Sequence, residues 1–218
     1  MRTNLKNNYR WVVITMLILL PLLSWLNIYN FQPQLTARAI FPLLGVWAWL
    51  IMWTHYVFWW FEKRNKSIKP SQKYNQISMQ LVLVLILLHP GLLAWEQYRL
   101  FGLLPPDSFT LYVAPELQVF VSMGSLALLL FLVYEVTQRL RNSDWFKRQR
   151  GWVSISQAVA MTLVFIHGIM IGDTVLHSWM LGIWVFLGVM LTPLLLLAIR
   201  ESSWEAKKST IEQPAREP

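Results

Sequence analysis

The sequence has no cysteine and little charge. The absence of cysteine among the 218 residues excludes disulfide relay chemistry, iron–sulfur clusters and any cofactor held by thiolates. Only 14% of the residues are charged, which is too few to cover the surface of a soluble domain of this length. The chain also has neither a glycine-rich phosphate loop nor a dinucleotide-binding fingerprint. We therefore expect any flavin- or nicotinamide-dependent step to come from a separate protein.

The sequence contains instead six long apolar blocks. Hydrophobic residues make up 56% of the chain, and each block is close to the ~20 residues that a helix needs to cross a bilayer. No block alternates with the period of two typical of membrane β-strands. The sequence predicts one all-α domain, a polytopic membrane bundle of six transmembrane helices, followed by a short polar tail at 201–218 that we expect to be disordered. The predicted helices are 11–29, 40–61, 77–95, 117–136, 153–171 and 178–199.

Lysine and arginine are distributed very unequally between the loops. Seventeen of the 19 basic residues lie before the first block, between the second and third, between the fourth and fifth, or after the sixth. The positive-inside rule makes these segments cytoplasmic. We therefore expect both termini in the cytoplasm of a multi-pass protein of the inner (plasma) membrane. The basic character is explained by contact with anionic lipid headgroups, and no nucleic-acid partner is expected.

Two of the four histidines lie at matched depth. An ionisable residue at membrane depth is usually functional, although a single histidine can also simply hydrogen-bond to a neighbouring helix. His89 and His167 lie in blocks that run in the same direction, and at about 1.5 Å per residue both reach the outer half of the bilayer. Two imidazoles in this arrangement are what a bis-histidine haem needs, since each ring can offer one nitrogen to iron.

The other two histidines have no such partner. His55 lies near the cytoplasmic end of the second block, and no second histidine occurs at its depth. It is either a packed, hydrogen-bonded residue or a contact to a flavin or quinone near the inner face. His177 lies in the short external connection before the last block, where an interfacial position is the simplest interpretation.

Two short motifs resemble a known family. The segment Leu87 to Leu93, which reads LLHPGLL, resembles the LLHPLLL segment of the ferric reductase-like transmembrane domain. The segment Leu163 to Asp173, which reads LVFIHGIMIGD, resembles that family's ALLHGLLLGTD segment. The resemblance covers roughly Lys73 to Arg200 well and the first two helices only loosely. This family includes NADPH oxidases, six-transmembrane metalloreductases and the haem-binding subunit of the methionine sulfoxide reductase system.

The resemblance implies a membrane subunit that carries electrons through haem b to an acceptor on the periplasmic or extracellular face. By it, His89 and His167 are the axial ligands of the iron. Arg99 and Arg38, the only basic residues expected outside, are candidates to pair with the haem propionates. The electron donor would be a cytoplasmic flavin reductase or a quinol, and FMN, FAD or a quinone could lie near the cytoplasmic side. The chain would thus be an oxidoreductase component that needs a separate flavin-containing donor.

The chain departs from the two-haem members of the family. Those members carry a second histidine about four helical turns earlier in each ligand helix. Here these positions fall on Asn75 or Gln76 and on Val153 or Ser154, so one haem is expected rather than two. Two other interpretations stay open: a scaffold or assembly subunit of the same fold without a cofactor, and a transporter or channel.

Overall fold

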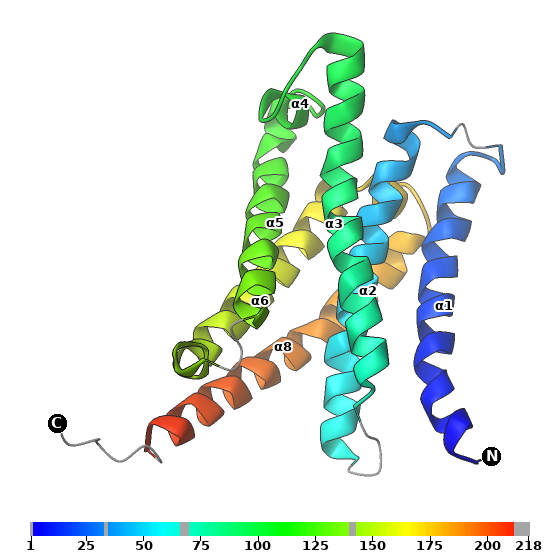
Figure 1. The fold of residues 1–218 in the computed structure, drawn as a ribbon. Helices are drawn as coiled ribbons and strands as arrows, with labels where there is room; N and C mark the ends of the chain where they lie inside the picture. The colour runs from blue at the N-terminus through cyan, green and yellow to red at the C-terminus, as the bar shows by residue number, and fades with distance from the viewer. Residues whose placement is uncertain (1, 33–34, 66–69, 140–142, 212–218) are drawn as a thin grey trace.

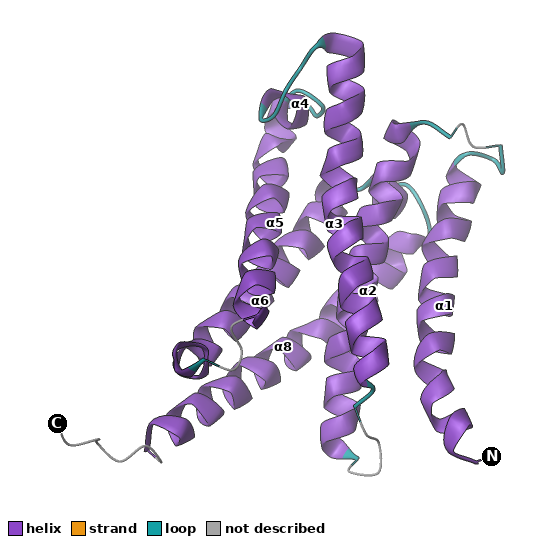
Figure 2. Ribbon diagram, in the orientation of Figure 1, coloured by secondary structure: helices purple, strands orange, loops and turns teal. Residues whose placement is uncertain are grey.

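The computed structural model describes residues 2–32, 35–65, 70–139 and 143–211. Within these ranges the chain forms helices and their connections, with no strand (Figures 1 and 2). The helices are α1 (Arg2–Ile28), α2 (Ala37–Arg64), α3 (Gln72–Phe101), α4 (Asp107–Thr110), η1 (Pro115–Leu117), α5 (Gln118–Arg139), α6 (Asp144–Ile171), α7 (Asp173–Leu176) and α8 (Met180–Ile211).

The predicted all-α fold is confirmed for the described part of the chain. Six of its helices, α1, α2, α3, α5, α6 and α8, are long and apolar enough to cross a membrane. One prediction was wrong in part, because α8 continues through 201–211, where the sequence predicted a disordered tail. That stretch contains two Glu, two Lys and one Ala, which favour helix, and no Gly or Pro. The rest of the predicted tail, 212–218, lies outside the described residues.

Two antiparallel helix pairs form the centre of the bundle. Helix α3 packs along α2, and α6 packs along α5. Helix α2 also contacts α1, α6 and α8, and it is the most buried of the long helices, with Trp49 inaccessible to solvent. In Figure 1, α1 begins and α8 ends at the lower end of the bundle, and α4 lies at the upper end. We call the α2–α3 and α5–α6 pairs the two hairpins.

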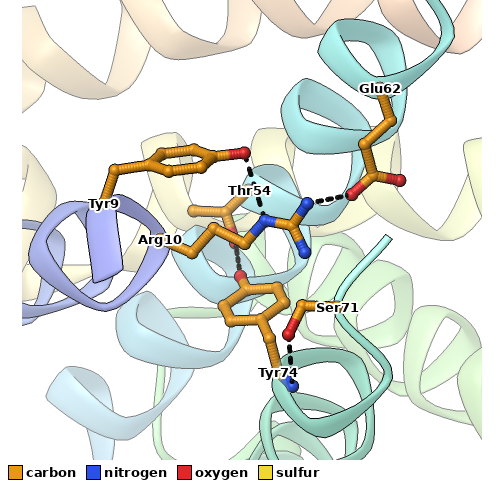
Figure 3. Close-up of polar contacts among 6 residues, drawn as sticks. All are labelled: Tyr9, Arg10, Thr54, Glu62, Ser71 and Tyr74. Carbon is orange, nitrogen blue, oxygen red and sulfur yellow. Dashed lines mark hydrogen bonds and ion pairs between the residues drawn. The ribbon is translucent and has the colours of Figure 1, made fainter. Parts of the chain in front are cut away.

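Polar side chains on α1, α2 and α3 form a buried cluster at the lower end (Figure 3). The Arg10 guanidinium is inaccessible to solvent and donates to Glu62 Oε1 at 2.6 Å and to the Tyr9 hydroxyl at 3.1 Å. Its Cζ lies within 5.7 Å of the Tyr9, Phe58 and Tyr74 ring centroids. This arrangement satisfies a cation that would otherwise be very costly to bury. The cluster therefore fixes α1 against the first hairpin.

We predict that Glu62→Leu and Arg10→Met each lower the free energy of unfolding by about 3–5 kcal/mol, because each breaks a largely buried ion pair. The double variant should recover much of this loss, because it removes both charges. The measurement is unfolding of the detergent-solubilised protein in a double-mutant cycle.

The exposed ion pair between Lys63 and Glu201 is the matched control, because such surface pairs contribute only about 0–1 kcal/mol. If single substitutions of Lys63 or Glu201 lowered the free energy of unfolding as much as those of Arg10 and Glu62, burial would not explain the strength of the Arg10–Glu62 pair.

Candidate functional site

The structure brings His89 and His167 together. His89 lies on α3 and His167 on α6, so each hairpin contributes one ring. The ring centroids are 6.3 Å apart, and the ring planes are inclined by 77°. The matched depth inferred from the sequence thus corresponds to a direct approach of the two imidazoles.

A backbone carbonyl on the preceding long helix holds each ring. His89 Nδ1 lies 2.6 Å from the Phe41 carbonyl oxygen, and His167 Nδ1 lies 2.8 Å from that of Phe120. Because a carbonyl oxygen only accepts, Nδ1 must carry the hydrogen in both rings. Each neutral ring therefore keeps an unprotonated Nε2. Among the described residues no hydrogen bond to either Nε2 is found.

A glycine lies under each ring. A Cβ at Gly45 would lie 2.9 Å from His89 Nδ1, and a Cβ at Gly124 would lie 2.6 Å from His167 Nδ1. Real Cβ atoms do not approach other atoms so closely, so any larger residue would displace the imidazole. Sequence reasoning missed both glycines. The available signal was a repeated pattern. Gly45 and Gly124 each come four positions after a phenylalanine, and the carbonyl of that phenylalanine accepts the hydrogen bond from the histidine.

The two histidines line a cleft between the hairpins, which we call the upper cleft. Its empty volume is about 1190 Å³, part of which is open to the outside. The walls are mostly apolar and aromatic, and they include both glycines, Trp49 and Phe131. A large apolar cleft with two convergent polar groups is the usual form of a cofactor site.

The donor set fits a metal whose other ligands come from a macrocycle. The described residues contain no group of three or more His, Asp or Glu side chains that could hold a bare metal ion. Two imidazoles bound on opposite sides of one metal at about 2 Å each would place their centroids about 6 Å apart, and the observed separation is 6.3 Å. A planar, apolar macrocycle such as haem matches both the two-nitrogen donor set and the cleft walls.

The structure does not bring Arg99 to this cleft. Arg99 is exposed near the upper end of α3 and does not line the cleft. Arg38 lies closer, because its Cζ is 5.3 Å from the ring centroid of Tyr112, a residue of the cleft wall. Burial and the nearby Asp173 carboxylate raise the pKa of Tyr112, and Arg38 opposes that shift. Of the two arginines, Arg38 is thus the one next to a residue of the cleft wall.

His55 lies apart from the other two histidines, in a second cleft below them. Its Nε2 lies 2.7 Å from the Ser78 hydroxyl oxygen. This lower cleft has an empty volume of about 460 Å³ and shares Met52, Ile86 and Phe131 with the upper cleft. His177 is exposed, and its side chain lies 4.0 Å from the Asp173 carboxylate.

Comparisons of the chain with protein-family models, with curated proteins and with solved structures find no match.

We predict that Gly45→Ala and Gly124→Ala each lower the free energy of unfolding by about 1–3 kcal/mol, as overpacking does, with Gly124→Ala the more damaging. Its added methyl group would approach the imidazole more closely. The measurement is thermal unfolding of the detergent-solubilised variants.

The control is Gly91→Ala on the same helix as His89, because a Cβ there meets nothing within 4 Å. It should leave stability unchanged or raise it slightly, since alanine favours helix over glycine. Equal losses at all three glycines would show that they act through helix propensity rather than through space for the imidazoles.

Proposed function

We propose that the chain is a membrane electron-transfer subunit that holds one b-type haem between His89 and His167. The observation that carries this proposal is the pair of neighbouring imidazoles, each with Nδ1–H bound to a carbonyl and Nε2 left unprotonated. The resemblance of the histidine segments to the ferric reductase-like transmembrane domain points in the same direction.

The residues around the rings hold the ligands in place before any cofactor binds. The Phe41 and Phe120 carbonyls select the tautomer that leaves Nε2 available, and such hydrogen bonds also make a ligating imidazole more basic. Gly45 and Gly124 let the rings lie close against the opposing helices. Trp49 and Phe131 line the cleft with apolar surface and help to exclude water. Bound haem b would supply a one-electron couple.

The direction of electron flow follows from charge. If the basic loops are cytoplasmic, the upper cleft is nearer the outer face and the lower cleft nearer the inner face. Electrons would then enter from a cytoplasmic-side flavin or quinol and leave to a periplasmic or extracellular acceptor. The two clefts are neighbours, because the side chains of Met52, Ile86 and Phe131 line both.

We expect about one haem per chain in protein purified from cells with ample haem supply, with sharp α and β bands after dithionite reduction. His89→Ala and His167→Ala should each lose this spectrum, because a single imidazole leaves one axial position open. The measurement is haem content per chain together with the reduced-minus-oxidised absorption spectrum.

His177→Ala is the matched control, because His177 is exposed and lies outside both clefts. Haem retained in both His89→Ala and His167→Ala, or absent from the unsubstituted chain, would contradict the proposal. The second of these outcomes would favour a scaffold of the same fold.

A further inference from the structure

The lower cleft lies entirely within the long apolar helices. All of its lining residues belong to the segments long and apolar enough to cross a membrane. This setting suits a ligand that is soluble in lipid. The upper cleft differs, because residues of the connection around α4 contribute to its wall.

The lining chemistry of the lower cleft opposes a flavin nucleotide. Among the residues that the structure describes, its ionisable groups are His55 on α2 and Tyr134 and Glu135 on α5, and no described lysine or arginine lines it. A flavin phosphate would carry close to two negative charges and would lie near the Glu135 carboxylate, with no cation among the described residues of the wall. Arg150 is exposed and does not line the cleft, although it is close enough to interact electrostatically with Tyr134.

The tautomer of His55 follows from its partner. Ser78 Oγ lies 2.7 Å from the Tyr74 carbonyl oxygen, which can only accept, so the serine hydroxyl donates there. The same oxygen must then accept from His55 Nε2–H at 2.7 Å. His55 consequently keeps an unprotonated Nδ1, the opposite choice from His89 and His167. In the described part of the chain no hydrogen bond to this Nδ1 is found.

We propose that the lower cleft binds the ring of a lipid-soluble quinol, with His55 Nδ1 accepting one hydroxyl proton and Glu135 the other. The two acceptors come from different hairpins, and Gln157 on α6 adds a further polar group to the wall. Oxidation breaks both quinol O–H bonds and converts the ring to a quinone. One proton goes to Nδ1 and one to the Glu135 carboxylate. The two electrons would leave one at a time: a haem bound in the upper cleft would accept the first and pass it to the acceptor on the outer face before it accepts the second. The redox step, unlike the binding, therefore rests on the proposed function.

The first test is equilibrium dialysis of ubiquinol-1 under argon against the detergent-solubilised protein, with ubiquinone-1 and FMN in parallel. We expect the quinol to bind more tightly than the quinone, because the quinone has no hydrogen to offer Nδ1. His55→Phe, which keeps the ring volume, should weaken quinol binding about tenfold, the equivalent of one good hydrogen bond. Ser78→Ala should reduce the preference for quinol over quinone, because it frees His55 to adopt the other tautomer.

His177→Phe is the matched control and should bind the quinol like the unsubstituted chain, since His177 lines neither cleft. Unchanged quinol affinity in His55→Phe overturns the proposal, provided that its thermal unfolding matches the control. FMN binding that competes with the quinol and is lost in His55→Phe also overturns it.

A second measurement separates this inference from the proposed function. In haem-loaded protein, stopped-flow reduction of the haem by ubiquinol-1 should be about tenfold slower in His55→Phe, with haem content and dithionite reduction unchanged. Protein without haem that still binds quinol through His55 would contradict the proposed function and support the proposed quinol site in the lower cleft. Protein with haem that is reduced equally fast in both forms would contradict the assignment of the lower cleft and leave the haem site intact.

Discussion

An imidazole inside an apolar bundle carries one N–H that has to find an acceptor within the protein. In this chain the acceptor of each ring in the upper cleft is a backbone carbonyl on the other helix of its hairpin, from Phe41 for His89 and from Phe120 for His167. This one interaction selects the tautomer, orients the ring and draws it against the opposing helix. The glycine beneath each ring then becomes necessary, because the ring occupies the space of its Cβ.

The lower cleft applies the same constraint with the opposite outcome. There the acceptor is the Ser78 hydroxyl rather than a carbonyl, and it takes the hydrogen of Nε2 instead of Nδ1. The two kinds of histidine thus leave different nitrogens unprotonated: Nε2 in the upper cleft, where a metal is proposed, and Nδ1 in the lower one, where a proton acceptor is proposed. Since both clefts share Met52, Ile86 and Phe131, the proposed quinol would lie next to the proposed haem.

The spanning helices and the histidine pair could be predicted because both follow from distance along the chain. Apolar blocks of about 20 residues have few alternatives to a membrane helix, and equal depth on parallel helices is a matter of counting residues. Which residue faces which helix depends on packing that no single sequence reveals. Arg99 therefore fell on an exposed face, away from the cleft. The roles of Gly45 and Gly124 were missed for the same reason, since they appear only once the hairpins are paired.

The central claim is that both imidazoles bind one iron, and electron paramagnetic resonance of the oxidised, detergent-purified protein tests it most directly. The ring planes are inclined by 77°, and crossed axial imidazoles leave the iron orbitals that lie along them nearly equal in energy. We therefore predict a single, strongly anisotropic low-spin ferric signal that accounts for about one haem per chain. A high-spin ferric signal, as a single histidine ligand gives, would contradict the account, and so would the absence of any haem signal.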